Sequence, residues 1–215
     1  MLLSFDTATP LVSVALHDGH EVVAERPSDH PMKHGEQLAP LIASVLADAG
    51  VVRQDLTAIA VGVGPGPFTG LRVGLVTART LAHVLDIPVY GVCSLDVIAV
   101  EAVDTGTVRG EFMVATDARR KEVYVATYDE QGRRTDGPHV VKPAAAATAL
   151  PVAGDGARLY AEAFPHAVAP NRPSAGWLAR VVTEERAVLL DPDPLYLRRP
   201  DAVENAHRKP VLPGA

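Results

Sequence analysis

The sequence contains a single cysteine, few aromatic residues and no long apolar segment. Because Cys93 is the single cysteine, a disulfide framework and a zinc site built from cysteines are excluded. Its apolar stretches are interrupted by Pro65, Pro67, Asp86 and Asp96, so none approaches the roughly 18 residues of a membrane-spanning helix. The first residues carry no basic segment ahead of the apolar ones, so we expect no secretory signal. These absences predict a cytoplasmic protein without membrane association.

An excess of positive charge is also lacking. The chain has 20 basic and 26 acidic residues, a net charge of −6. Its basic residues adjoin at most in small groups such as Arg119-Arg120, Arg133-Arg134 and Arg198-Arg199. A protein that binds nucleic acid by itself needs a basic patch that displaces counterions. If this protein acts on RNA, we therefore expect contact with the RNA to be indirect, through a partner.

The remaining composition is that of a globular protein. The chain has 215 residues, of which 47% are apolar and 21% charged, enough for one large domain or two small lobes. Hydrophobic periodicity predicts five strands and three helices in the first half. The strands are expected at 2–7, 12–18, 21–25, 58–63 and 88–93, and the helices at 36–49, 70–85 and 95–103. This order predicts an α/β fold with a mixed sheet and helices packed on it.

A segment of sixteen residues in the second half aligns without a gap with one in the first half, at an offset of 111 residues. Leu3–Asp18 then faces Val114–Asp129, and Asp6 meets Asp117 at the end of the first strand in each half. The repeat predicts a duplicated fold with an N-terminal lobe at 1–105 and a smaller C-terminal lobe at 106–199. The smaller lobe has weaker helical segments, at 144–150 and 176–185. We expect residues 200–215 to form a flexible tail.

Several motifs suggest chemistry but lack its requirements. The segment Gly62–Gly70 joins a strand to a helix, yet it lacks the Lys-Ser/Thr of a phosphate loop, and its two prolines remove N–H donors. His30 and His34 have the spacing of zinc ligands, but the intervening Pro31 indicates a loop with solvated histidines. Ser94 is placed to cap the following helix. These features favour structural roles.

Asp6 and Asp117 are the best candidates for cofactor binding. In a two-lobed fold they could face each other and hold a hydrated magnesium ion. However, neither is followed by the glycines with which a hairpin wraps a phosphate. We therefore expect a retained fold with a degraded site, and no catalytic residue, metal or cofactor in the isolated chain.

A stripe of small residues runs along the predicted second helix. Glycine costs about 1 kcal/mol relative to alanine inside a helix, so Gly74 indicates close approach of another group. The stripe could pack on the chain's own sheet or contact another subunit, and both interpretations stay open. We predict a subunit interface on the first two helices, at Leu38, Leu41, Ile42, Val45, Gly70, Gly74, Ala78 and Ala82.

Five motifs resemble one family in sequence order. They are Phe5–Thr9, His34–Pro40, Gly64–Gly74, Asp117–Tyr124 and Pro194–Arg198. They are similar to the TsaB (YeaZ) family, subunits of the bacterial machinery that makes N6-threonylcarbamoyladenosine in tRNA. The family usually has serine where this chain has Gly35 and Pro67, which puts only local turn geometry in doubt.

The resemblance implies an actin/Hsp70-like two-lobed (ASKHA, RNase H-like) fold that has lost its own activity. It further implies that the chain supports the catalytic relative TsaD, with the ATPase TsaE, during transfer of the threonylcarbamoyl group to the adenosine 3′ of the anticodon. ATP or ADP would bind, if at all, at the interface of that complex. Alone, the chain would form a homodimer.

The same resemblance indicates how the activity was lost. TsaD carries two metal-binding histidines spaced four apart, and these positions fall on Ser94 and Ile98 here. Isoleucine cannot bind a metal. Two other classes stay open: a metal-dependent peptidase or ATPase acting on its own, and a homodimeric nucleotide-binding module.

Overall fold

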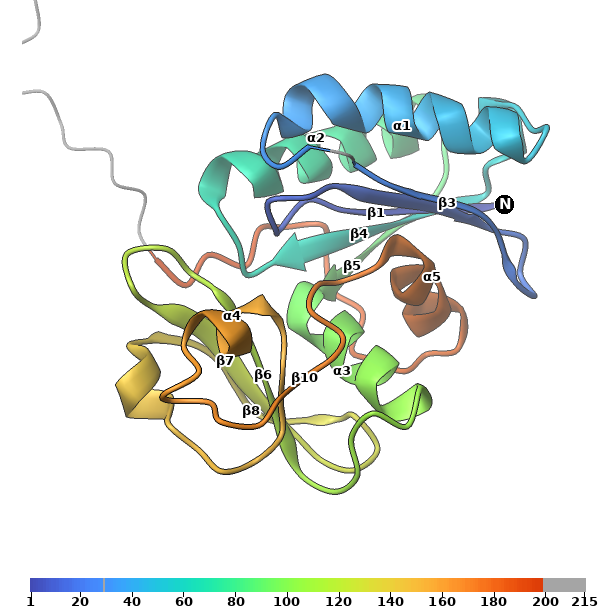
Figure 1. Cartoon of the computed structure of the whole chain (residues 1–215). Coiled ribbons are helices and arrows are strands. Elements are labelled where there is room, and N and C mark those ends of the chain that lie inside the picture. Colours follow the sequence, from blue (N-terminus) through green and yellow to red (C-terminus); the bar gives the residue numbers. More distant parts are fainter. Residues whose placement is uncertain (29, 199–215) are drawn as a thin grey trace, which may run out of the picture.

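Two five-stranded mixed sheets form the centres of the two lobes (Figure 1). The computed structural model describes residues 1–28 and 30–198, so the predicted tail at 200–215 lies outside the described residues. The first sheet has the strand order β3-β2-β1-β4-β5. Its strands are β1 (Leu2–Asp6), β2 (Ser13–His17), β3 (Val22–Pro27), β4 (Ala58–Gly64) and β5 (Val89–Cys93). The first three strands pair antiparallel, whereas β1–β4 and β4–β5 pair parallel.

The second sheet repeats this topology. Its order is β10-β9-β6-β7-β8, in which β6 takes the place of β1, and the parallel and antiparallel pairs correspond. Its strands are β6 (Phe112–Asp117), β7 (Val123–Tyr128), β8 (Arg134–Val141), β9 (Val152–Ala153) and β10 (Ala167–Val168). The duplication predicted from the sequence is confirmed. The reduction of the second lobe is visible in β9 and β10, which have two residues each.

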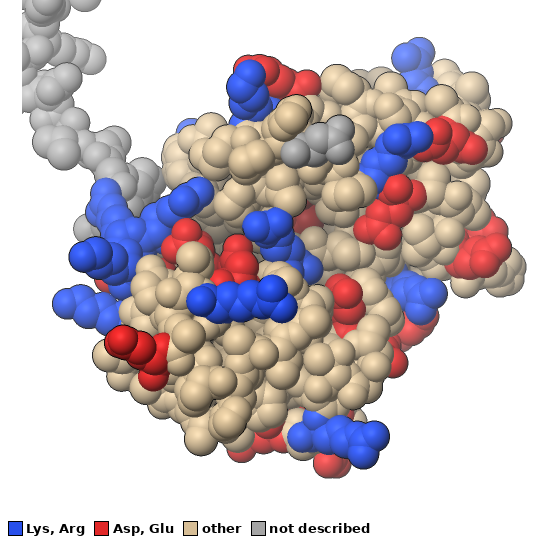
Figure 2. All heavy atoms as spheres, viewed as in Figure 1, with Lys and Arg blue, Asp and Glu red and all other residues tan. Residues whose placement is uncertain are grey.

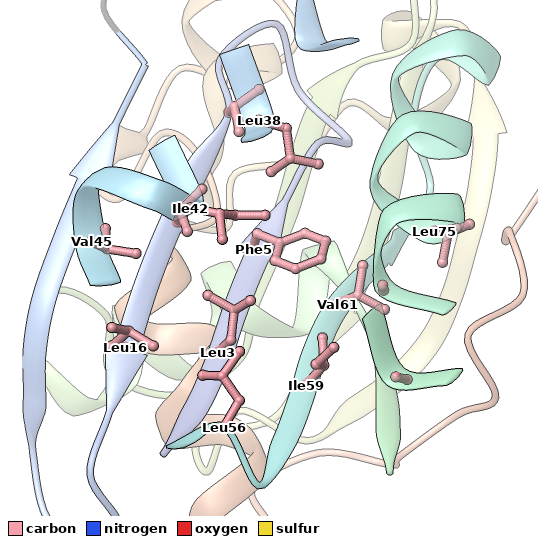
Figure 3. Packing of buried hydrophobic residues seen from close by; sticks show 14 of the residues in the cluster. Leu3, Phe5, Leu16, Leu38, Ile42, Val45, Leu56, Ile59, Val61 and Leu75 are labelled. Atoms are coloured by element: carbon pink, nitrogen blue, oxygen red, sulfur yellow. The ribbon is translucent and has the colours of Figure 1, made fainter. Parts of the chain in front are cut away.

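Helices cover both faces of the first sheet. On one face lie α1 (His34–Asp48) and α2 (Phe68–Leu85), and on the other lies α5 (Ala175–Thr183). The alternation of strand side chains sets these layers, since Leu3 and Phe5 face α1 and α2 while Leu2 packs in the cluster with α5. Figure 3 shows side chains of α1 and α2 meeting those of the strands in the first of these cores.

The second lobe uses shorter elements. Helix α3 (Ser94–Asp104) packs on its sheet, and α4 (Asp155–Leu159) contacts β6. Short 3₁₀ turns occur at η1 (Arg53–Asp55) and η2 (Pro143–Ala146). The helix expected at 144–150 is wrong, because only the first of these residues join η2 and no regular helix follows. The run of alanines there has helical propensity but too few apolar contacts to fix a longer helix.

The predicted lobe boundaries need one correction. Residues up to 105 do contain the whole first sheet, but α5, which the sequence assigned to the second lobe, packs on β1, β2 and β4 of the first. Leu178, Ala179 and Val181 of α5 are fully buried in that contact. The chain therefore returns to the first lobe after forming the second.

The predicted interface positions also need correction. Leu41 is half-buried, and the other seven positions are buried inside the chain itself. A methyl group on Gly74 would lie 2.4 Å from Thr7 Oγ1, and one on Gly70 would lie 2.6 Å from the Thr7 carbonyl oxygen. The stripe of small residues thus lets α2 approach the β1–β2 turn. The stripe therefore packs inside the chain itself, which is one of the two interpretations that the sequence left open.

We predict that Gly74→Ala destabilises the protein by about 1–3 kcal/mol, because the methyl group overlaps Thr7 in a packed interior. Gly35→Ala in α1 is the matched control, since the nearest atom to its added methyl group is a side-chain carbon 4.0 Å away. There helix propensity should make the substitution neutral or stabilising. Urea denaturation measures both, and equal effects of the two substitutions would contradict the packing argument.

Candidate functional site

Asp6 lies at the end of β1, inside the first lobe. Its Oδ1 accepts a hydrogen bond from the Ala8 amide at 2.7 Å, and its Oδ2 accepts one from Ser94 Oγ at 2.5 Å. Burial raises the pKa of Asp6, and the bonds from Ser94 and Ala8 oppose that rise. A methyl group on Gly62 would lie 1.8 Å from Oδ2. The carboxyl group therefore joins β1 to the start of α3 and is closed off by β4.

The turn that follows Asp6 is covered by other parts of the chain. Gly66 approaches it so closely that an added methyl group would lie 2.4 Å from the Ala8 carbonyl oxygen. His34 Nε2 lies 2.8 Å from the Thr9 carbonyl oxygen and the residue is buried at the start of α1. The expectation of a solvated loop histidine was wrong for His34. Its ring holds this turn in place.

Asp117 occupies the equivalent position at the end of β6. Its Oδ1 accepts a hydrogen bond from the Arg119 amide at 2.9 Å, and its Oδ2 lies 3.6 Å from the Arg119 guanidinium. Its own amide donates to Asp155 Oδ1 at 3.2 Å. Within residues 1–28 and 30–198, no hydrogen bond joins Asp6 to Asp117. Each aspartate is held by its own surroundings.

A small hollow lies where the two lobes meet. Its volume is about 200 Å³, below the roughly 300–1,000 Å³ of typical small-molecule sites. The first lobe contributes Gly66–Phe68, the second lobe Ala118–Arg120 and Tyr124, and the end of the described chain Tyr196–Arg198. An ATP-sized molecule does not fit this hollow as it stands.

The segment Pro194–Arg198 crosses between the lobes. On the first lobe, the Leu195 amide donates to the Val63 carbonyl at 2.9 Å, and the Tyr196 ring stacks on Phe68 with centroids 5.1 Å apart. On the second lobe, Arg198 donates to the Ala118 carbonyl at 2.8 Å and pairs with Glu122. We call Pro194–Arg198 the strap. It fastens the two sides of the hollow together.

A buried polar network joins the lobes below the strap. Tyr128 Oη of the second lobe donates to Asp96 Oδ1 at 2.8 Å, and Arg134 lies 3.5 Å from the other oxygen. Burial raises the pKa of Asp96, while Arg134 and Tyr128 stabilise its charge. Cys93 lies beside this network, and burial raises the pKa of its thiol to about 12, so it is unreactive. The predicted Ser94 cap is wrong, because its hydroxyl donates to Asp6 instead.

A second carboxylate pair borders a hollow of about 580 Å³. Burial, with a smaller contribution from the charge of Glu25, raises the pKa of Glu101 to about 7. Glu25 Oε1 accepts hydrogen bonds from Ser174 Oγ at 2.8 Å and the Gly176 amide at 3.1 Å. Glu101 Oε2 is buried and has no hydrogen-bond partner among the described residues. Sequence reasoning missed this pair, since the two glutamates lie on separate elements.

Two further sequence signals went unused. Pro194–Arg198 combines an aromatic and a basic side chain, Tyr196 and Arg198, which make the contacts to the two lobes. The Gly154-Asp155-Gly156 segment after a short apolar run was also passed over. Asp155 starts α4 and holds Asp117, and burial raises its pKa.

The described part of the chain contains neither a candidate metal-binding cluster nor a helix that could span a membrane. No group of three His, Cys, Asp or Glu side chains there could hold a metal ion. No helix within the same ranges has the length and apolar content to cross a bilayer. Two lobes with the same strand order and an acidic residue ending each central strand define the class of duplicated, actin-like α/β proteins.

Comparisons with known proteins identify the family. Residues 23–182 match the family described as TsaD, tRNA N6-adenosine threonylcarbamoyltransferase. An uncharacterized Mycobacterium tuberculosis protein is 46% identical, with 94% of this chain and 93% of the relative covered. The Bacillus subtilis tRNA threonylcarbamoyladenosine biosynthesis protein TsaB is 36% identical, over 59% of this chain and 54% of that protein.

Among solved structures, YeaZ from Pseudomonas aeruginosa superposes with a TM-score of 0.74 at 30% identity, covering 91% of this chain and 99% of that one. The chain belongs to the TsaB (YeaZ) family, as the motifs indicated. The relatives from Bacillus subtilis and Escherichia coli are both named tRNA threonylcarbamoyladenosine biosynthesis protein TsaB.

The raised pKa of Glu101 predicts a pH-dependent stability. The folded state binds the proton of the Glu101 carboxyl group more tightly than the unfolded chain does. The stabilisation of the folded state by this protonation is therefore complete below about pH 4.5 and is lost as the pH rises to about 7. Glu101→Gln should therefore melt at a higher temperature than the parent at pH 8, with the difference shrinking toward pH 5. Glu111 is exposed, so the control variant Glu111→Gln should have the melting temperature of the parent at both pH 8 and pH 5. A gain that is independent of pH would contradict this assignment.

The strap contacts predict that Tyr196→Ala lowers the free energy of unfolding by about 1–2 kcal/mol, because stacking on Phe68 is lost. Tyr196→Phe keeps the ring and removes only the 3.3 Å contact of the hydroxyl with Arg72. Urea denaturation should therefore give Tyr196→Phe a free energy of unfolding close to that of the parent and Tyr196→Ala a lower one. Amide exchange at the β6–β7 turn should quicken only in Tyr196→Ala.

Proposed function

We propose that this chain is a non-catalytic subunit of a cytoplasmic complex with TsaD and TsaE. In this role it supports threonylcarbamoyl transfer to the adenosine 3′ of the anticodon in tRNA. The observation that carries the proposal is the environment of Ser94 and Ile98. The resemblance aligns these residues with the metal-binding histidines of TsaD, and here they are 2% and 0% exposed.

The residues at these two positions do not fit a metal. Ser94 donates its hydroxyl to Asp6, and Ile98 packs in the core under the second sheet. A metal ion would meet a hydrocarbon side chain on one side and an engaged carboxyl group on the other. No step of a reaction is therefore assigned to a metal in this chain, which disfavours the peptidase and independent ATPase alternatives.

Nucleotide binding by the isolated chain is also disfavoured. Asp6 is buried and engaged, the turn after it is covered by Gly66, and the hollow between the lobes is small and crossed by the strap. In our proposal ATP or ADP binds only where a partner completes a site. The homodimeric nucleotide-binding module is the weaker alternative for the same reasons.

The partner surface in this proposal is the outer side of α1 and α2. These helices form the outer layer of the first lobe (Figure 1). The inward positions pack on the sheet, but Val76 and Val84 on α2 are 62% and 70% exposed. Leu41 on α1 and Val73 on α2 are half-buried. An exposed apolar strip of this kind favours protein contact, with a second copy of the chain when TsaD is absent.

The proposal predicts that Val76→Arg abolishes copurification with TsaD while the thermal melt stays within about 2 °C of the parent, because an exposed residue contributes little to folding. Val52→Arg is the control, since Val52 is 59% exposed but precedes η1 and belongs to neither α1 nor α2. A folded Val76→Arg protein that copurifies normally would exclude this face. Failure of the parent chain to bind TsaD would sink the proposed function itself.

A further inference from the structure

The second lobe contains a hollow of about 770 Å³ between η2 and α4, which we call the α4 hollow. It has an apolar floor with one aromatic ring, formed by Pro143, Ala144, Ala147, Leu159, Tyr160 and Ala163. Three cationic side chains, Lys121, Lys142 and Arg158, line it as well. They come from three separate segments: the β6–β7 turn, the residue before η2, and α4.

Within residues 1–28 and 30–198, no salt bridge engages the three cations. All three residues are exposed, and in the described ranges none has a carboxylate partner. One acidic side chain, Glu162, also lines the hollow, so the cations outnumber it three to one. Unpaired cations around an apolar floor favour a ligand with both negative charge and a flat apolar group.

The β6–β7 turn continues this charge toward the boundary of the lobes. Arg119, Arg120 and Lys121 have φ angles of 61°, 54° and 61°, so three successive basic residues form a tight turn. Arg119 and Arg120 line the hollow at the lobe boundary, and Lys121 lines the α4 hollow. Figure 2 shows Lys and Arg gathered on the side of the molecule where the lobes meet and the described chain ends.

The two lobes differ in charge accordingly. Residues 1–105 contain five basic and twelve acidic residues, whereas residues 106–174 contain nine basic and eight acidic ones. The net charge of −6 thus conceals a second lobe that is slightly positive and carries a basic surface. The sequence, with basic residues adjoining only in small groups, did not reveal this surface because the chain folds three segments together to make it.

We propose that the α4 hollow binds a single-stranded segment of RNA, with phosphates at Lys121, Lys142 and Arg158 and a base stacked on Tyr160. Single-stranded nucleic acids are bound in this way, by basic grooves that follow the backbone and aromatic rings that stack on bases. An acidic peptide could pair with the three cations, but it has no base to stack on the Tyr160 ring. The choice of tRNA as the RNA rests on the proposed function.

Fluorescence anisotropy with the full chain and a labelled tRNA transcript that has adenosine 3′ of its anticodon tests the proposal. The variant is Lys142→Gln with Arg158→Gln, and the control is Arg53→Gln with Arg109→Gln, which removes the same charge from exposed sites outside the hollow. At 50 mM salt, the variant should bind about tenfold more weakly and the control within about twofold of the parent. Losing two phosphate contacts should also reduce the slope of log affinity against log salt by about 1.4.

Tyr160→Leu tests the stacking part of the proposal. It keeps an apolar floor and all three cations, so affinity should fall about tenfold while the salt slope stays unchanged. A structural role of the tyrosine would instead lower the melting temperature, which is measured in the same samples. An unchanged affinity would overturn the assignment of Tyr160.

Three outcomes would overturn RNA binding at this hollow. They are no binding of the parent chain at 50 mM salt, equal losses in the double variant and its control, and displacement of the tRNA by labelled polyglutamate at equal concentration. The last would indicate an acidic protein ligand. Copurification with TsaD separates the two proposals, because the double variant should retain it. Loss of TsaD binding by the parent chain with RNA binding intact would sink the proposed function alone.

Discussion

The burial of α3 between the two sheets is the constraint on which the rest of the structure depends. Leu95, Ile98 and Ala99 pack under the second sheet, while Val97 and Val100 pack with α5 under the first. Each fully buried aliphatic side chain contributes about 1.5–3 kcal/mol. One short helix thus supplies core to both lobes. The two positions that the resemblance aligns with metal ligands of TsaD both lie on this helix, where Ser94 bonds to Asp6 and Ile98 packs in the core.

The buried carboxyl groups follow from that arrangement. Asp6 bonds the first residue of α3, and Asp96 in its first turn bonds Tyr128 of the second lobe. Carboxyl groups withdrawn from water are stabilised only when hydrogen bonds or charges replace the water. Both are so engaged that neither is free to receive a ligand. The strap adds a further connection, from Phe68 on one lobe to Ala118 on the other.

Two surfaces of the molecule are candidates for contact with other molecules. Exposed apolar residues lie on α2 of the first lobe, and the cations of the α4 hollow lie around η2 and α4 of the second. Because these two surfaces belong to different lobes, a protein partner on one leaves the other accessible. In our proposals the fixed relation of the lobes would set the position of RNA relative to a catalytic partner.

Hydrophobic periodicity and the sixteen-residue match at an offset of 111 were enough to predict the α/β class, the duplication and most elements of the first lobe. Local patterns carry that information because strand alternation and helical spacing reflect burial directly. They failed for β9, β10 and α4, which are too short to show a period. The direction of the Gly74 stripe, the return of α5 to the first sheet and the gathering of Lys121, Lys142 and Arg158 depend on contacts between distant segments. Only the tertiary structure decided these, because a side chain's neighbours across the fold are not encoded in its local spacing.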